Sequence, residues 1–205
     1  MSDTRLYLIS PAQIDLDTFK DTLVTALDAG DVASFQLRLK SASDEEISEA
    51  AQTLMPLCHA RDVAFILNDR ADLAQALDTD GVHMGQEDGD IKQVRKLLGN
   101  DKVIGVTCHN SRHLSMVAGE QGADYVAFGA FYPTSTKTVE HYAEPSLLSW
   151  WIELFEIPCV AIGGITPDNA APLVDAGADF IAVSSAVWTH PDGVDSAVKQ
   201  FNGLF

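Results

Sequence analysis

The sequence predicts a single-domain (β/α)8 barrel, an α/β fold in which eight parallel strands alternate with helices. Short apolar runs alternate eight times with longer segments of helical period. No G-x-G-x-x-G motif follows the first run, which favours a closed barrel over an open dinucleotide-binding sheet. At 205 residues the chain is short for a barrel and too small for two comfortable domains. We therefore expect residues 1–205 to form one catalytic barrel.

The strands are expected at eight apolar runs: 6–9, 35–39, 63–67, 81–84, 103–106, 125–128, 159–162 and 180–183. Helical periodicity predicts helices between them: 15–27, 44–58, 71–77, 90–98, 111–121, 145–155 and a short one beginning near 169. Ser43 and Glu46 have the spacing of a capping box at a helix start. Pro172 fits the seventh helix only in its first turn.

A weak internal repeat supports the same organisation. An acidic residue beside glycine recurs where a helix ends and a strand begins, at 29–31, 78–81, 122–124 and 177–179. Glycine at a helix end supplies the left-handed conformation that turns the chain back. The recurrence indicates repeated strand–helix units with short turns.

Charge and cysteine content limit the classes of partner. The 30 acidic and 13 basic residues give a formal net charge of −17, which argues against nucleic acids and anionic membranes. Cys58, Cys108 and Cys159 are widely spaced and indicate neither a disulfide framework nor a zinc site. No apolar run approaches a membrane span and no secretion signal precedes the first strand, so we expect a cytoplasmic protein. Its oligomeric state stays open: tryptophans 150, 151 and 188 suggest a subunit contact or, preferably, helix packing.

Polar side chains alternate with apolar ones along the second expected strand. Gln36, Arg38 and Lys40 share one face, and apolar residues occupy the other. Because the apolar face must pack on helices, the polar face points into the barrel and toward its mouth. Two cations without an acidic residue between them favour an anion such as diphosphate over an internal ion pair.

Two aspartates follow neighbouring strands. Asp69 comes directly after the third and Asp88 shortly after the fourth. Mg²⁺ typically binds one or two protein carboxylates together with phosphate oxygens and water. An N-cap role competes for Asp69, but less so for Asp88, because Asp90 is better placed as a cap. As a pair beside Arg38, they favour metal.

Three side chains at the end of the fifth strand are predicted to have different roles. The Thr107 hydroxyl is suited to a phosphate. His109 is either a general base or, more commonly for such a residue, a packed and hydrogen-bonded histidine. Cys108 has no recognisable base partner, so we expect a small buried residue.

A second anion site is expected over the last strands. The long loop 129–145 contains three hydroxyls and a lysine, which suit a phosphate: Thr134, Ser135, Thr136 and Lys137. Glycines follow the seventh strand, including Gly164, and serines follow the eighth, Ser184 and Ser185. Backbone amides bind a monophosphate at this place in barrels, and small side chains permit the close approach.

Five segments together resemble the thiamine phosphate synthase family over nearly the whole chain. They are QLRLK at 36–40, NDR at 68–70, DGVHMGQED at 80–88, YPTSTK at 132–137 and AIGGI at 161–165. The resemblance implies a (β/α)8 barrel transferase of thiamine biosynthesis. Its reaction joins 4-amino-2-methyl-5-hydroxymethylpyrimidine diphosphate to hydroxyethyl-methylthiazole phosphate, giving thiamine phosphate and diphosphate by a Mg²⁺-assisted dissociative substitution.

The resemblance also implies roles for individual residues. Mg²⁺ is held by Asp69 and Asp88. The pyrimidine diphosphate is bound by Gln36, Arg38, Lys40, Asn68, Thr107 and Lys137, of which Arg38, Lys40, Thr107 and Lys137 are implied to act in catalysis. The thiazole phosphate is bound by Thr134, Ser135, Thr136, Gly164, Ser184 and Ser185.

Three departures and three alternatives accompany this interpretation. Leu39 stands where the family has an acidic residue, Thr107 where it has serine, and segment 139–144 where a glycine-containing loop is commoner. One alternative is a thiazole tautomerase-like isomerase of the same family, which uses a histidine near His109. The others are a non-catalytic barrel that binds thiamine intermediates and an amino-acid-biosynthesis isomerase, which would leave both aspartates without a purpose.

Overall fold

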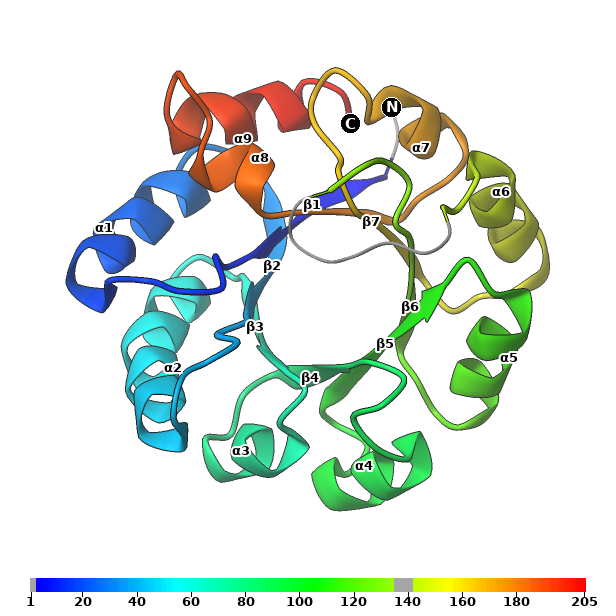
Figure 1. Cartoon of the computed structure of the whole chain (residues 1–205), viewed down its shortest axis with the longest axis horizontal. Helices are drawn as coiled ribbons and strands as arrows, with labels where there is room; N and C mark the ends of the chain where they lie inside the picture. The colour runs from blue at the N-terminus through cyan, green and yellow to red at the C-terminus, as the bar shows by residue number, and fades with distance from the viewer. Residues whose placement is uncertain (1–2, 135–141) are drawn as a thin grey trace.

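The computed structural model is a closed barrel of eight parallel strands surrounded by helices (Figure 1). The structure describes residues 3–134 and 142–205. Each strand pairs with the next in chain order, and the eighth pairs with the first. The predicted fold class is confirmed. Within the described ranges, the helices are all too short or too polar to cross a bilayer.

The strands are β1 (Arg5–Ile9), β2 (Val32–Leu37), β3 (Ala64–Asn68), β4 (Gly81–Met84), β5 (Val103–His109), β6 (Tyr125–Phe128), β7 (Cys159–Ile162) and β8 (Phe180–Val183). The helices are α1 (Leu16–Leu27), α2 (Asp44–His59), α3 (Ala71–Ala76), α4 (Ile91–Leu98), α5 (Arg112–Glu120), α6 (Pro145–Leu154), α7 (Ala171–Asp175), α8 (Ser185–Trp188) and α9 (Val194–Asn202).

Helix starts follow the sequence signals. Ser43 and Glu46 form the expected capping box at the start of α2, and Pro172 lies in the first turn of α7. Helix α9 was not among the predicted elements, although Ala197, Val198 and Phe201 bury one of its faces. These three residues have the i, i+1, i+4 spacing of an amphipathic helix, so the signal was present.

β1 and β3 differ from the predicted bounds by one residue, and β2 and β5 differ by more. β2 was expected at 35–39 but begins at Val32 and ends at Leu37, because the amides of the next residues bond to the loop after β1. The Arg38 N–H donates to Ser10 Oγ at 2.8 Å and the Lys40 N–H to the Ala12 carbonyl at 3.2 Å. β5 was expected to end at Val106 but continues to His109, with an irregular register against β6 between Thr107 and His109.

The core has two layers, separated by the strands. Outside the barrel, apolar side chains such as Phe35 and Leu37 pack against the helices. Trp151 is fully buried in this layer, with its ring stacked 4.1 Å from Phe155. Trp188 donates its indole N–H to the Ile9 carbonyl at 2.6 Å. Both tryptophans therefore serve helix packing, as preferred. A smaller apolar cluster fills the barrel interior: Tyr7, Ile9, Tyr125, Ala127, Val160 and Ala182.

Candidate functional site

Polar side chains from neighbouring strands meet inside the barrel at the carboxyl ends. Gln36 is buried, and its Nε2 donates to Asn68 Oδ1 at 2.6 Å. The inward orientation expected of Gln36 is confirmed, since Phe35 and Leu37 on either side pack on the helices. The side-chain amides of Gln36 and Asn68 thus lie at the base of the opening at the carboxyl end of the barrel.

Cationic side chains follow the end of β2. Arg38 is half-buried, and its guanidinium lies close enough to Asp69 to oppose, in part, the rise in the pKa of that carboxyl that burial causes. Lys40, two residues further on, is exposed. The two cations therefore lie on the loop after β2 rather than on the strand, but on the same rim as the aspartates.

The Asp69 and Asp88 carboxyls lie within hydrogen-bonding distance of each other. Burial raises the pKa of Asp69 above its usual value, and the Asp88 carboxyl raises it further. Asp88 Oδ2 also accepts the Gly85 N–H at 2.7 Å, which fixes it over the end of β4. Two carboxylates at such close range repel one another when both are ionised, and a cation between them would relieve that repulsion.

Asp69 does not cap the helix that follows it. The N-cap position of α3 is Arg70, without a side-chain cap bond, and Asp69 has a φ of 64°. Asp90 caps α4 by accepting the Gln93 N–H at 3.0 Å, as expected. The competing N-cap role of Asp69 is therefore excluded, and its carboxyl faces the mouth.

The donor set fits Mg²⁺ better than an all-protein metal cage. Within residues 3–134 and 142–205, no three His, Cys, Asp or Glu side chains gather as a metal site. Two carboxylates leave the remaining positions of a six-coordinate ion to water and phosphate oxygens. Asp69 and Asp88 thus offer two oxygen ligands of the kind that hard divalent cations bind.

Thr107 and His83 form the wall opposite Gln36. Thr107 Oγ1 lies 2.7 Å from His83 Nε2, and the Thr107 carbonyl accepts from Gln86 Nε2 at 2.6 Å. Burial is the main cause that lowers the pKa of His83, to about 4, with the Arg38 charge adding to it. His83 is therefore neutral at physiological pH. His109 ends β5 half-buried, with a φ of 52°.

The turn after β7 lies against the loop after β6. Gly164 has a φ of +68°, and a Cβ there would lie 2.4 Å from the Pro133 carbonyl oxygen. Only glycine fits both constraints. The Tyr132 N–H donates to the Gly163 carbonyl at 3.0 Å, so this contact brings the loop leading to Thr134 next to Gly164. Ser184 and Ser185 follow the adjacent β8.

Three expected site residues, Ser135, Thr136 and Lys137, lie outside the described residues. All three cysteines are buried and unbridged, and burial raises the pKa of each thiol to about 12. The small buried role expected of Cys108 is thereby confirmed.

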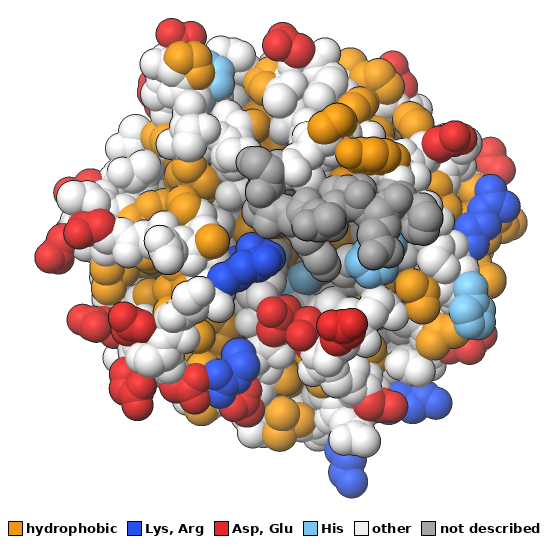
Figure 2. Space-filling view, viewed as in Figure 1, with side chains coloured by type: hydrophobic (Ala, Val, Ile, Leu, Met, Phe, Trp, Pro, Cys, Tyr) orange, Lys and Arg blue, Asp and Glu red, His pale blue; other side chains and the backbone are white. Residues whose placement is uncertain are grey.

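Figure 2 shows the face seen along the barrel axis. A basic side chain lies near its centre beside a group of acidic ones, and the other basic side chains visible on this face are spread toward its edge. This pattern agrees with an anion site built from few cations in a protein of net charge −17.

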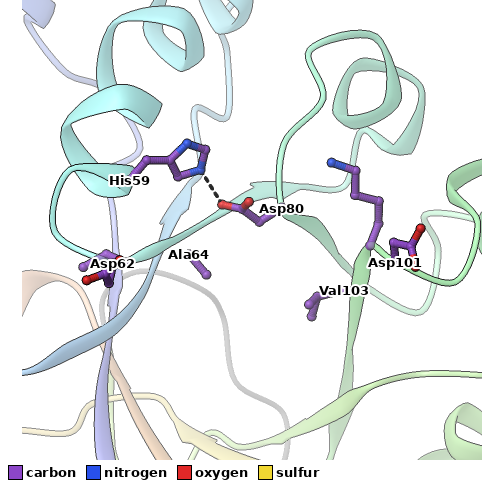
Figure 3. A pocket seen from close by; sticks show the side chains of 8 residues that line it. His59, Asp62, Ala64, Asp80, Asp101 and Val103 are labelled. Carbon is purple, nitrogen blue, oxygen red and sulfur yellow. Dashed lines mark hydrogen bonds and ion pairs between the residues drawn. The ribbon is translucent and has the colours of Figure 1, made fainter.

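A hollow of about 490 Å³ opens at the opposite, amino-terminal end of the strands (Figure 3). His59 Nε2 and Asp80 Oδ2 lie 2.7 Å apart across it, and Asp80 also accepts the Phe65 N–H. In barrel enzymes the chemistry lies at the carboxyl end, and conserved structure at this end serves stability. The hollow is therefore not the candidate site.

Sequence reasoning missed Tyr7 and Tyr125, which lie in the barrel interior. Their hydroxyls are 2.8 Å apart, and that of Tyr7 donates to Gln36 at 3.0 Å. Gly105 was the available signal, because a Cβ there would lie 1.9 Å from the Tyr125 ring. A glycine within a β-branched strand indicates close approach by a neighbour.

Comparison with known proteins identifies the family. A family model described as thiamine monophosphate synthase matches residues 6–187. The chain is 60% identical to thiamine-phosphate synthase of Rhodospirillum centenum, covering 98% of both chains. It is 54% identical to that of Erythrobacter litoralis, covering 97% and 93%. The solved thiamine phosphate pyrophosphorylase of Pyrococcus furiosus is 32% identical and superimposes with a TM-score of 0.85, covering 99% and 96%. The chain belongs to the thiamine monophosphate synthase family.

Proposed function

We propose that this protein is a thiamine phosphate synthase, a transferase of thiamine biosynthesis. It joins 4-amino-2-methyl-5-hydroxymethylpyrimidine diphosphate to hydroxyethyl-methylthiazole phosphate and releases diphosphate. Family membership over almost the whole chain supports the activity. The meeting of Arg38, Asp69 and Asp88 at one edge of the barrel is the observation that carries it, because a diphosphate leaving group needs cations and a metal there.

Each substrate has its own set of side chains in this proposal. The pyrimidine diphosphate is bound by Gln36, Arg38, Lys40, Asn68, Thr107 and Lys137. The thiazole phosphate is bound by Thr134, Ser135, Thr136, Gly164, Ser184 and Ser185. The contact between Gly164 and the loop 132–133 supports the second set, since it brings the segment that leads to Thr134 next to the turn after β7.

Asp69 and Asp88 would hold Mg²⁺. When bound, the ion would neutralise charge on the departing diphosphate. Arg38, half-buried beside Asp69, contributes a fixed positive charge at the same edge. Lys40 and Lys137 add further cations, and a partly desolvated site makes each of them more effective than in water.

The protein's part in the reaction is placement and leaving-group stabilisation. The methylene C–O bond breaks, and its electron pair leaves with the diphosphate. The thiazole nitrogen then donates its lone pair to the pyrimidine-methyl cation, forming the new C–N bond. No proton transfer is needed to balance the reaction, so neither His83 nor His109 is required as a base. Alignment of the two substrates supplies much of the remaining rate enhancement.

A product assay tests the proposed function. Purified protein should form thiamine phosphate and diphosphate in equal amounts only when both substrates and Mg²⁺ are present. The His109→Ala variant should keep this activity. Isomerisation of a thiazole substrate without diphosphate release, lost in His109→Ala, would instead identify a tautomerase. Binding of either substrate without turnover would identify a non-catalytic barrel.

A further inference from the structure

A chain of hydrogen bonds runs through the barrel interior, beneath the mouth. Five bonds join six side chains, each from a different strand, in the order Thr107, His83, Tyr125, Tyr7, Gln36 and Asn68. The donor–acceptor distances are 2.7, 2.9, 2.8, 3.0 and 2.6 Å in that order. Thr107 and Asn68 at the two ends, together with Gln36, belong to the proposed pyrimidine site, whereas His83, Tyr125 and Tyr7 connect them without being part of it.

The two side-chain amides fix the direction of the chain at one end. Asn68 Oδ1 accepts from Gln36 Nε2 at 2.6 Å, which commits the Gln36 NH₂ group to Asn68. The Asn68 NH₂ group is left for the Asp69 side chain, to which Asn68 hydrogen-bonds. The Gln36 oxygen is left to accept from the Tyr7 hydroxyl at 3.0 Å.

The remaining links follow because each phenol has a single hydrogen. The Tyr7 hydrogen is committed to Gln36, so Tyr7 accepts from Tyr125. The Tyr125 hydrogen is then committed to Tyr7, so Tyr125 accepts from His83 Nδ1. A neutral imidazole protonated on Nδ1 has an unprotonated Nε2, which must accept from the Thr107 hydroxyl.

Burial keeps every member of the chain in its neutral form. It raises the pKa of both tyrosines and lowers the pKa of His83 to about 4. Each phenol and the imidazole therefore carry one hydrogen at neutral pH. Every link then has one donor and one acceptor.

We propose that the chain runs in one direction, from Thr107 to Asn68, with His83 held as its Nδ1–H tautomer. Thr107 Oγ then faces the substrate solely as an acceptor, whereas the Asn68 amide faces the mouth as a donor. Tyr7, Tyr125 and His83 act as positioning residues, because they set these roles without reaching the substrate.

This direction specifies which part of the substrate lies at Thr107; the inference rests here on the proposed function. An ionised diphosphate has acceptors only, so Thr107 cannot pair with it. The amino group of the aminopyrimidine is a donor and fits. This proposal differs from the sequence expectation, in which Thr107 gives its hydroxyl to a phosphate. The diphosphate is left to Arg38 and the metal, and the ring amino group to Thr107.

The tautomer of His83 is measurable in the protein without substrate. Long-range ¹H–¹⁵N correlation spectra distinguish protonated from unprotonated ring nitrogens, and His83→Gln assigns the signals. Wild-type protein at pH 7.5 should show Nδ1 protonated and Nε2 unprotonated. Protonated Nε2 in the wild type would overturn the proposal, whatever the activity. Because no turnover is involved, this result is independent of whether the proposed function holds.

The Tyr7→Phe variant tests whether the direction is transmitted. Without the Tyr7 oxygen, Tyr125 can donate to His83 Nδ1, which moves the ring hydrogen to Nε2 and lets Nε2–H donate to Thr107. We expect the tautomer to switch and KM for the pyrimidine diphosphate to rise about tenfold, as for one lost hydrogen bond. The Kd for inorganic diphosphate with Mg²⁺ should stay unchanged, because that group does not contact Thr107.

Thr79→Val is the matched control. Thr79 is buried on the approach to β4, and its hydroxyl donates to the Gly81 carbonyl at 3.0 Å, at the opposite end of the barrel from His83. It should lose stability while keeping the Nδ1–H tautomer and the wild-type KM. If Tyr7→Phe keeps the wild-type tautomer and KM, the chain of hydrogen bonds does not decide whether the Thr107 hydroxyl donates to the substrate or accepts from it. If the tautomer switches in a protein that forms no thiamine phosphate, the chain's direction stands and only the proposed function fails.

Discussion

Two separate constraints, one on the backbone conformation and one on the space for a side chain, require glycine at position 164. Its φ of +68° disfavours any side chain, and the Pro133 carbonyl occupies the space that a Cβ would need. Gly99 also has a positive φ, of +78°, but nothing lies within 4 Å of the position of its Cβ. A substitution at Gly99 therefore tests backbone strain alone, whereas a substitution at Gly164 tests strain together with a disturbed contact to the loop after β6.

We expect Gly164→Ala to raise KM for the thiazole phosphate about tenfold or more, because the displaced loop leads to Thr134. Gly99→Ala should leave KM unchanged, although each variant should lose about 1–3 kcal/mol of unfolding free energy from strain. Urea denaturation and steady-state kinetics measure the two effects separately. An unchanged KM in Gly164→Ala would remove this turn from the thiazole phosphate site.

Single residues also show where prediction from sequence ends. Gln36 was assigned to the barrel interior by alternation alone, because flanking Phe35 and Leu37 must pack on helices. Tyr7 and Tyr125 were not assigned, since phenols among apolar residues read equally well as ordinary core. Their roles depend on a hydroxyl separation of 2.8 Å between β1 and β6, which no local pattern encodes.

At the scale of elements, the helix-to-strand turns share one device. The acidic residue of the sequence repeat accepts the first amides of the preceding strand. Asp80, Asp124 and Asp179 accept the N–H groups of Phe65, Ile104 and Cys159, at 2.6, 2.7 and 2.7 Å. Asp31, the fourth member, instead binds the Arg5 guanidinium at the start of β1. Each aspartate thus links the two strands of one β–α–β unit.

Removing one of these aspartates should destabilise the barrel without altering the site. Asp179→Ala leaves the Cys159 amide without its 2.7 Å acceptor, so we expect the free energy of unfolding to fall by about 1–3 kcal/mol. The exposed Asp175→Ala, at the end of α7, should stay within about 0.5 kcal/mol of wild type. Equal denaturation midpoints for both variants would show that the hydrogen bond from the Cys159 N–H to Asp179 does not stabilise the barrel.

The observed bounds of a strand agree with its predicted apolar run where turn residues close to that run in the sequence end the strand. β4, β6, β7 and β8 agree with their apolar runs, because turns close both ends. β2 and β5 do not, because their ends depend on partners in other segments. Ser10, on the loop after β1, accepts the Arg38 amide and ends β2, and only the folded barrel brings those residues together.

For the whole molecule, the main electrostatic feature is a half-buried arginine, Arg38, at the carboxyl end of the barrel in a chain of net charge −17. Most other arginines are neutralised locally: Arg5, Arg61, Arg70 and Arg95 each bind an aspartate. No such salt bridge engages Arg38 in the described part of the chain, and its charge lies beside Asp69 at the mouth. The Arg38 guanidinium is therefore available to bind an anion at the place where we propose that the diphosphate binds.

The sequence predicts which side chains meet at this edge of the barrel, but it does not predict the directions of their hydrogen bonds. Fold class, inward face and the pairing of Asp69 with Asp88 follow from periodicity and from the adjacency of β3 and β4. The position of Lys137 relative to them stays a prediction, since it lies outside the described residues. Donor and acceptor roles depend on six strands at once and require the structure.

Calorimetric titration with inorganic diphosphate shows whether Asp69 and Asp88 bind a diphosphate through Mg²⁺, as we propose. Asp62, in the hollow at the other end of the barrel, provides a control of equal charge change. We predict that Asp69→Asn, or a chelator with wild-type protein, weakens diphosphate binding at least about tenfold, the equivalent of about 1.4 kcal/mol. Asp62→Asn should bind as wild type does. Equal affinity in wild type, Asp69→Asn and metal-free protein would show that these aspartates do not bind diphosphate through a metal ion.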